Sequence, residues 1–141
     1  MKRSRHHTGW AGALYVAAEL SRRGYDATLT FGNTPSLDLL CASPNGKPFK
    51  IQVKSLTTGN AVLIQKSLLD TDPQPDLFFA VVLVPAKEEA PMEFRILTHH
   101  EVIELRKSMR KEKKDGQSYK LDGLYWSVVK PYKGGWEKLP K

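Results

Sequence analysis

The sequence predicts an α/β protein in which helices pack on both sides of a mixed central sheet. Three observations lead to this fold class. An apolar helical pattern comes first, at residues 10–23, and a β-hairpin pattern follows at residues 37–53. An almost wholly apolar run then occupies residues 77–84. A run this short and this rich in β-branched residues is typical of a strand that is buried on both faces, so each face of its sheet needs a covering layer.

The composition is that of a single domain, which we expect to span residues 1–141. The chain is long enough to bury a core and has no internal repeat or low-complexity tract. Lysine and arginine number 22 against 15 aspartate and glutamate residues, so the formal net charge is +7. Such an excess favours a polyanionic partner, either nucleic acid or an anionic membrane surface. The single cysteine, Cys41, gives no disulfide framework and is predicted to be a small buried thiol.

The N-terminus has the outline of a signal peptide, since three bases precede an apolar stretch at residues 10–18. Glu19 interrupts that stretch before a cleavage site, and no segment approaches transmembrane length. We therefore expect a cytoplasmic protein that makes no membrane contact. The sequence also leaves room for a homodimer.

Periodicity and turn chemistry define the N-terminal elements. Residues 1–8 are basic and predict a mobile arm. The helix expected at residues 10–23 is followed by Gly24, which suits a C-terminal cap. Residues 25–31 predict a strand and residues 32–35 a loop. The apolar face of the helix consists of Ala13, Ala17 and Leu20, with Leu14 and Ala18 beside them.

The segment after the hairpin alternates turns with short strands. A turn at residues 57–60 precedes a short strand at 61–64, and two prolines and three acids make residues 70–76 a loop. A strand is expected at 77–84, and another at 92–97 after a polar connection.

A second helix begins at Thr98, where Thr98 and Glu101 have the spacing of a capping box. Its buried stripe should comprise Val102, Leu105 and Met109. A loop at 115–123 and a last strand at 124–129 complete the predicted elements. The aromatic residues Trp126, Tyr132 and Trp136 could stack on bases, but covering the edge of the core is the favoured interpretation.

The hairpin carries the candidate site. Its second strand alternates, so that Gln52 and Lys54 point to one face while Ile51 and Val53 point to the other. Asp38, on the first strand, can point to the same face as Gln52 and Lys54. A carboxylate, an amide oxygen and an ammonium would then meet on one side of the sheet. The alternative is an ordinary hairpin whose Gln and Lys are simply solvated.

The arrangement D-x13-Q-x-K on a hairpin resembles the core motif of the PD-(D/E)XK nuclease superfamily. It is most similar to the Q-x-K variants among Mrr-like and Holliday-junction-resolvase-like members. The resemblance extends to a preceding helix that ends in Arg23-Gly24-Tyr25, and it covers roughly residues 9–84. It implies a restriction-endonuclease-like α/β/α sandwich and metal-dependent hydrolysis of phosphodiester bonds in DNA.

The resemblance also implies roles for the site residues. Asp38, the amide oxygen of Gln52 and the backbone carbonyl of Val53 would hold Mg²⁺ or Mn²⁺, which prefer oxygen ligands. Lys54 would orient the attacking water and stabilise the charge that develops on the phosphate. Asp38, Gln52 and Lys54 are thus the predicted catalytic residues.

Two departures from the family pattern keep other functions open. Gln52 stands where most members have an acid, and Ala13 stands where many relatives have a glutamate in the first helix. One carboxylate then remains, and Glu19 is expected to pair with Arg22 or Arg23 instead. The alternative function is a catalytically weak or inactive nuclease-fold protein that binds nucleic acid or a protein partner.

Basic residues at the N-terminus, on the hairpin and at the end of the second helix predict a surface that contacts phosphates. Residues 106–114 contain six bases and one acid. A solvated helix end that complements the helix dipole is an equally good explanation of this run. The predicted nucleic-acid-binding residues are Arg3, Arg5, Lys50, Arg106, Arg110 and Lys113.

Overall fold

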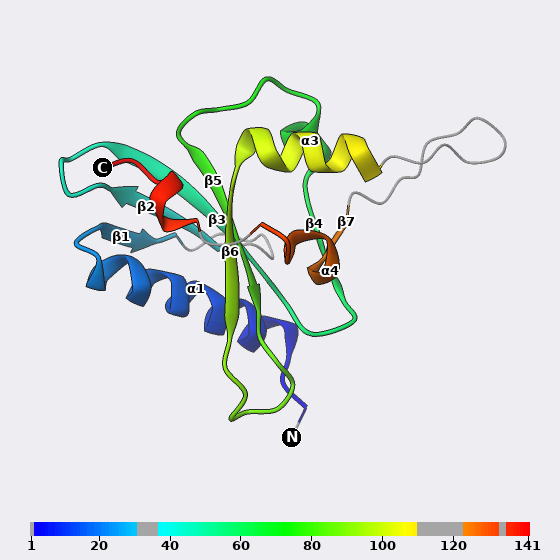
Figure 1. Cartoon of the computed structure of the whole chain (residues 1–141). Coiled ribbons are helices and arrows are strands. Elements are labelled where there is room, and N and C mark those ends of the chain that lie inside the picture. The colour runs from blue at the N-terminus through cyan, green and yellow to red at the C-terminus, as the bar shows by residue number, and fades with distance from the viewer. Residues whose placement is uncertain (1, 31–36, 110–122, 133–134) are drawn as a thin grey trace, which may run out of the picture.

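A computed structural model of the chain describes residues 2–30, 37–109, 123–132 and 135–141. Its centre is a five-stranded sheet (Figure 1). In the described part of the chain β3 and β5 are parallel and the other neighbours are antiparallel, so the sheet is mixed. The strands in spatial order are β1 (Asp26–Leu29), β2 (Leu37–Ala42), β3 (Pro48–Leu56), β5 (Leu77–Leu83) and β6 (Glu93–Thr98).

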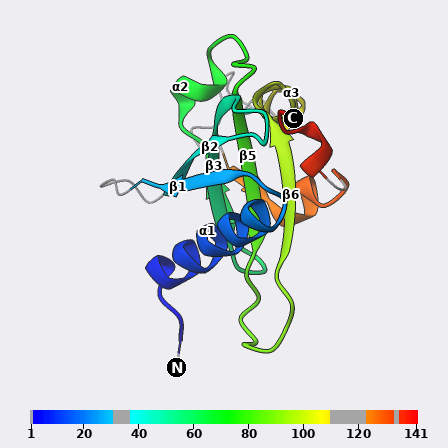
Figure 2. The same ribbon diagram turned by 90° about the vertical axis from the view of Figure 1, so that its left-hand side faces the viewer.

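Helices cover both faces of this sheet, as Figures 1 and 2 show for α1 and α3. The long helix α1 (Arg5–Arg22) packs on one face. On the other face lie α3 (His99–Met109) and a two-stranded sheet of β4 (Ala61–Leu63) and β7 (Gly123–Tyr125). The shorter helices are α2 (Lys66–Leu69), α4 (Trp126–Val129) and a 3₁₀ helix (Trp136–Lys138). The predicted α/β class with a mixed sheet is therefore confirmed.

Strand β5 explains why the core has two halves. Its side chains alternate, so that Phe78, Ala80 and Val82 join the apolar cluster beneath α1, whereas Phe79 and Val81 join the cluster beneath α3. All five are buried. The strand predicted to be buried on both faces is thus confirmed, and it separates the two clusters along the middle of the molecule.

The hairpin between β2 and β3 has the predicted turn. The Gly46 backbone N–H donates to the Ser43 carbonyl at 2.8 Å, and the Lys47 N–H donates to Ser43 Oγ at 3.0 Å. Gly46 has a φ of +83°, a conformation that favours glycine. This tight turn fixes the pairing register, and the register in turn decides which side chains of β2 and β3 share a face.

The N-terminal prediction was wrong in its boundary. Helix α1 begins at Arg5 because Ser4 caps it, with Ser4 Oγ accepting from the His7 N–H at 3.1 Å. The expected mobile arm at residues 1–8 is therefore helical from Arg5 onward. Arg3, before the cap, donates from Nη2 to the carbonyls of Val84 and Pro85 at 2.9 and 2.8 Å.

The apolar face of α1 also differs from the prediction. Leu14 is 51% exposed, whereas Gly12 and Val16 are buried against the sheet. Gly12 allows this close approach, because a Cβ at that position would lie 1.9 Å from Ser55 Oγ on β3. The small residue therefore sets the distance between α1 and the sheet.

Gly12→Ala should lower the free energy of unfolding by about 1–3 kcal/mol, since the added methyl group overpacks the contact with Ser55. The double variant Gly12→Ala with Ser55→Ala should recover part of this loss. Gly9→Ala is the matched control, because nothing lies within 4 Å of its added Cβ. We expect it to stabilise the helix by roughly 0.5–1 kcal/mol. Urea denaturation of the four proteins measures these differences, and equal effects at positions 9 and 12 would contradict this packing.

Helix α3 has the predicted capping box. The Glu101 N–H donates to Thr98 Oγ1 at 3.1 Å, and the Thr98 N–H donates to Glu101 Oε1 at 3.0 Å. Val102 and Leu105 are buried, and Met109 packs partly against the same cluster. The predicted start and apolar stripe of this helix are both confirmed.

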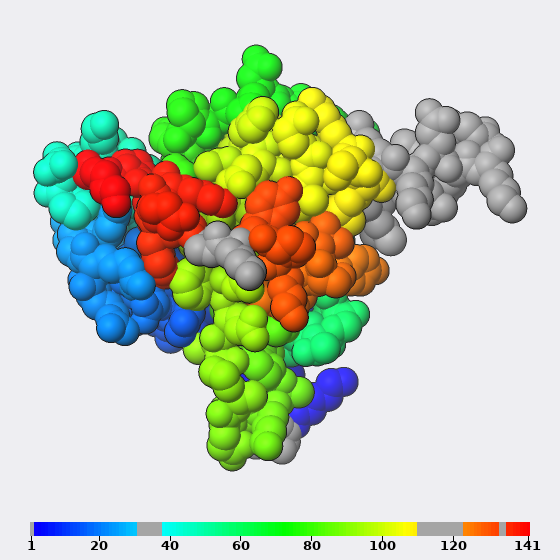
Figure 3. Space-filling model, in the orientation of Figure 1, coloured from blue at the N-terminus to red at the C-terminus, as the bar shows by residue number. Residues whose placement is uncertain are grey.

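The C-terminal segment holds the two halves of the molecule together. Tyr25 Oη donates to the Pro140 carbonyl at 2.8 Å, and Lys138 Nζ lies 3.0 Å from Glu101 Oε1. Trp136 packs against Phe94 with ring centroids 4.8 Å apart. Figure 3 shows this segment in red between the hairpin and α3. Trp126 and Tyr132 are partly buried against the other cluster, so the three aromatic residues cover the core edge as favoured.

Two local predictions failed in this half of the chain. The strand predicted at 124–129 ends at Tyr125, and the chain then turns into α4. Helix α2 was not predicted at all. A four-residue helix has no room for apolar periodicity, so propensity alone cannot identify it. Within the described residues, no helix is long and apolar enough to cross a membrane.

Acid should loosen the contact between Lys138 and Glu101. Burial by itself would raise the pKa of Glu101, but hydrogen bonds from Thr98 and Lys138 hold that pKa below its ordinary value. Glu101 therefore stabilises the fold above the unfolded pKa of about 4.3, and this contribution is lost as the pH falls through the lower folded pKa. We expect the free energy of unfolding to fall more steeply below about pH 5 in the parent than in Glu101→Gln. Parallel urea denaturation curves from neutral to acid pH would contradict this role.

Candidate active site on the β2–β3 hairpin

The pairing register brings the three predicted site residues together. Asp38 on β2 lies directly opposite Gln52 on β3. Lys54 follows Gln52 by two residues, so both side chains point to the same face of the sheet. Their neighbours Ile51 and Val53 are buried in the α1 cluster on the opposite face. Asp38, Gln52 and Lys54 therefore share the face that carries α3.

Burial increases across this group toward the centre of the sheet. The side chain of Asp38 is 28% exposed, whereas Gln52 is 7% and Lys54 is 9% exposed. On the next strand, Gln52 is paired with Phe79 and Lys54 with Val81, and both of these are fully buried. The site is thus partly exposed to solvent at Asp38 and bordered by apolar side chains at Lys54. The alternative of a solvated Gln and Lys on an open strand does not fit this burial.

Two buried oxygen atoms of the site have no hydrogen-bond donor among the residues that the structure describes. They are Asp38 Oδ1 and Gln52 Oε1, which belong to directly opposed residues. An unsatisfied buried oxygen costs free energy, and native structures rarely leave one without a partner. Each of the two atoms therefore calls for a donor or a cation.

The buried position of Lys54 disfavours the charged form of its side chain. Burial lowers the pKa of the Lys54 ammonium, and the neighbouring Asp38 carboxylate offsets only part of this shift. A lysine in such surroundings loses its proton more readily than one in water. Perturbed groups of this kind cluster at functional sites, which supports Lys54 as a candidate functional residue.

Two further positions of the family pattern, Ala13 and Val53, have side chains in the apolar cluster beneath α1. Ala13 is completely buried in the α1 cluster, on the face opposite Asp38 and Gln52. An acid at position 13 would therefore lie on the face of the sheet away from Asp38 and Gln52. The Val53 side chain also packs in that cluster, while its backbone pairs with Leu37, the first residue of β2.

The oxygen donors at the site are few. Within the described parts of the chain, no three His, Cys, Asp or Glu side chains gather as a metal-binding group. Asp38 supplies the carboxylate, and Gln52 supplies a neutral amide oxygen. This donor set suits a hard cation such as Mg²⁺ that keeps most of its water ligands.

The predicted nucleic-acid-binding residues have different surroundings. Arg5 is exposed in the first turn of α1, and Lys50 is half-exposed beside Asp38. Arg3 is held by backbone carbonyls, and Arg106 is buried with Nη1 donating to the Gly123 carbonyl at 3.0 Å. Its hydrogen bond to Gly123 gives the Arg106 side chain a structural role beside β7, and a phosphate contact by Arg106 stays a prediction. Arg110 and Lys113 lie outside the described residues.

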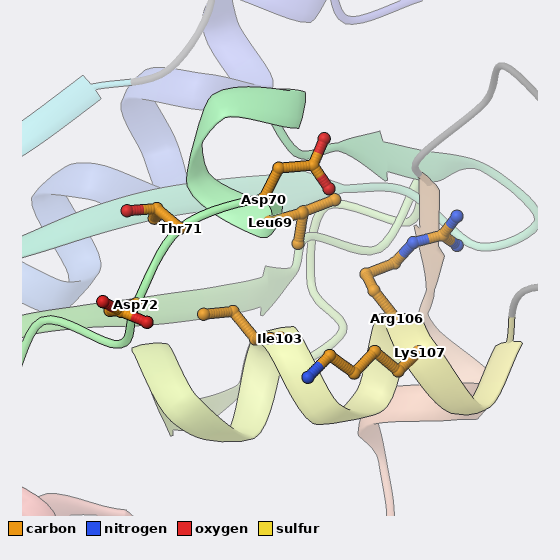
Figure 4. A pocket seen from close by; sticks show the side chains of 7 residues that line it. All are labelled: Leu69, Asp70, Thr71, Asp72, Ile103, Arg106 and Lys107. Carbon is orange, nitrogen blue, oxygen red and sulfur yellow. The ribbon is translucent and has the colours of Figure 1, made fainter.

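A separate pocket of about 530 Å³ lies between α3 and the loop after α2 (Figure 4). The sequence predicts only a loop for the acidic wall of this pocket, because Asp70 and Asp72 lie among prolines and form no motif. Asp38, Gln52 and Lys54 do not line this pocket. Its lining residues are Leu69, Asp70, Thr71, Asp72, Ile103, Arg106 and Lys107.

Comparison of the chain with family models, with curated proteins and with solved structures gives no match. The chemistry of the site is therefore the basis for a functional assignment.

Proposed function

We propose that the protein is a metal-dependent nuclease that hydrolyses phosphodiester bonds in DNA. The observation that carries this proposal is that Asp38 Oδ1 and Gln52 Oε1 are buried without a donor in the described part of the chain, on the same face of the sheet as the buried Lys54. A hairpin with only a structural role would gain nothing from this combination, because burying both oxygens and the ammonium costs free energy. A divalent cation and a phosphate would satisfy all three groups.

The resemblance to the PD-(D/E)XK superfamily supports the proposed nuclease function. The order of α1, β1 and the β2–β3 hairpin agrees with the family pattern, and helices flank the sheet on both sides. A restriction-endonuclease-like sandwich is thus the finer fold assignment that we propose. In it, Asp38, Gln52 and the Val53 carbonyl would hold Mg²⁺ or Mn²⁺.

Each residue of the site then has a chemical task. A bound divalent cation would supply Lewis acidity and lower the pKa of its water ligand. Asp38 would neutralise part of the cation's charge and help to hold it, and Gln52 would contribute a neutral oxygen. Lys54 would hydrogen-bond the attacking water and stabilise the charge that develops on the phosphate. Because Phe79 and Val81 exclude water beneath Lys54, these electrostatic interactions are stronger than they would be in water.

A second function is favoured by the small number of acids. With one carboxylate next to two lysines, the site could bind a polyanion without cutting it. The protein would then be a nuclease-fold protein that binds nucleic acid or a protein partner. The net charge of +7 supports a nucleic-acid partner for either function.

Incubation of the purified protein with duplex, junction and single-stranded DNA, in Mg²⁺, Mn²⁺ or EDTA, tests the proposal. We expect cleavage that requires the metal. Salt-sensitive binding of the same DNA without cleavage in any metal would favour the second function. Neither binding nor cleavage would leave a protein-interaction role.

A further inference from the structure

Lys50 makes an ion pair with the carboxylate of the proposed site. Its Nζ lies 3.4 Å from Asp38 Oδ2. Lys50 precedes Gln52 by two residues on β3, so its side chain points to the face that carries the site. The two oxygens of Asp38 are thus in different situations: Oδ2 faces the Lys50 ammonium, whereas Oδ1 is buried and receives no hydrogen bond from any described residue.

The site without an added ion has an excess of positive charge. Asp38 lies opposite Gln52, and its diagonal neighbours on β3 are Lys50 and Lys54. Lys54 is 9% exposed, while the side chain of Lys50 is 43% exposed. Lys54 is confined beside Phe79 and Val81, whereas the Lys50 ammonium can swing into solvent. Lys50 is therefore the movable cation of this group.

We propose that Lys50 is a built-in competitor of the metal ion, a positioning residue that occupies Asp38 until a divalent cation binds. Lys50 then leaves Asp38 Oδ2, and its ammonium becomes available to a phosphate of the substrate backbone. This inference rests on the proposed nuclease function and adds to it an order of events. It also gives Lys50 a role that the D-x13-Q-x-K pattern does not include.

The exposure of the pair determines how strongly Lys50 competes. Ion pairs exposed to this degree contribute little, because water and salt screen them. Their loss corresponds to roughly a two- to fivefold change in an equilibrium constant. Lys50 therefore hinders metal binding without preventing it.

The shared carboxylate should couple the metal and the substrate. A phosphate that binds the Lys50 ammonium draws it from Asp38, so the carboxylate becomes available to the metal. By thermodynamic linkage, the metal must then raise the affinity for the phosphate by the same factor. Part of this coupling should disappear when the ammonium is removed.

Calorimetric titration with Mn²⁺ tests the proposal on the parent and four variants. Lys50→Gln should bind Mn²⁺ roughly two- to fivefold more tightly than the parent, while Lys50→Arg, which keeps the cation, should match the parent. Lys47→Gln is the matched control, since it removes an exposed lysine from the turn of the same hairpin. A phosphorothioate duplex that resists hydrolysis should raise Mn²⁺ affinity less in Lys50→Gln than in the parent.

The outcomes separate this inference from the nuclease function. If the parent binds Mn²⁺, Asp38→Asn does not, and Lys50→Gln binds as the parent does, the competitor role of Lys50 is wrong and the metal site stands. If Lys47→Gln gains as much affinity as Lys50→Gln, the effect is one of net charge and the role is again wrong. If the folded parent binds no Mn²⁺, with or without the duplex, the proposed function and this inference both fail.

Discussion

Asp38→Asn and Lys54→Met should each reduce DNA cleavage by on the order of 100- to 1000-fold, the cost of losing one electrostatic contact to a transition state. Their causes differ. Asp38→Asn removes the carboxylate of the site, so Mn²⁺ affinity should fall with activity. Lys54→Met removes an ammonium that acts mainly on the transition state, so Mn²⁺ should still bind while kcat falls.

The stability of the two variants separates catalysis from folding. Burial lowers the pKa of Lys54, which means that the fold bears a cost for its charge. Lys54→Met keeps the length of the side chain and removes that charge, so we expect the variant to be at least as stable as the parent. Lys47→Met serves as a control on the exposed turn. Cleavage at the parent's rate by Asp38→Asn would indicate a contaminant or another site.

Local sequence patterns predicted much of the fold. The alternation along residues 49–54, the Ser43 to Gly46 turn and the Thr98–Glu101 capping box each depend on contacts within a few residues. Such contacts carry their own signal in sequence. The buried run at 77–84 was equally clear, because continuous apolar β-branched residues fit few other structures.

The failures concern contacts between distant segments. Leu14 was expected on the buried side of α1, but Gly12 decides which side approaches the sheet, and only the position of Ser55 reveals this. Arg106 belongs to a basic run, yet its side chain is buried and donates to the carbonyl of Gly123, which is 17 residues further along the chain. Neither contact could be inferred from spacing.

The site was predictable in one respect and not in another. Spacing and the hairpin turn determined that Asp38, Gln52 and Lys54 share a face. Which helix covers that face was not determined, because spacing along the hairpin says nothing about the helices that pack on it. The ion pair between Lys50 and Asp38 was missed as well, although the i, i+2 spacing of Lys50 and Gln52 already places both on one face.

Gln52→Glu should strengthen metal binding at this site by on the order of tenfold or more. The substitution adds a carboxylate directly opposite Asp38, and Gln52 Oε1 is already buried with no donor among the described residues. An anionic ligand attracts a hard dication far more strongly than an amide oxygen does, even in a medium as polar as water. Lys50 and Lys54 limit the repulsion between the two carboxylates in the metal-free protein. Calorimetric titration with Mg²⁺ and Mn²⁺ measures the gain.

Ala13→Glu places the same added charge on the other face of the sheet and so provides the contrast. Ala13 is completely buried among apolar side chains of the α1 cluster. An unpaired carboxylate there should lower the free energy of unfolding by about 3–5 kcal/mol and leave Mg²⁺ affinity unchanged. A folded Ala13→Glu that binds Mg²⁺ more tightly than the parent would mean that α1 does reach the site. If Gln52→Glu remains folded and gains no affinity, Asp38 and Gln52 do not hold a metal ion, and binding without cleavage becomes the better account of this hairpin.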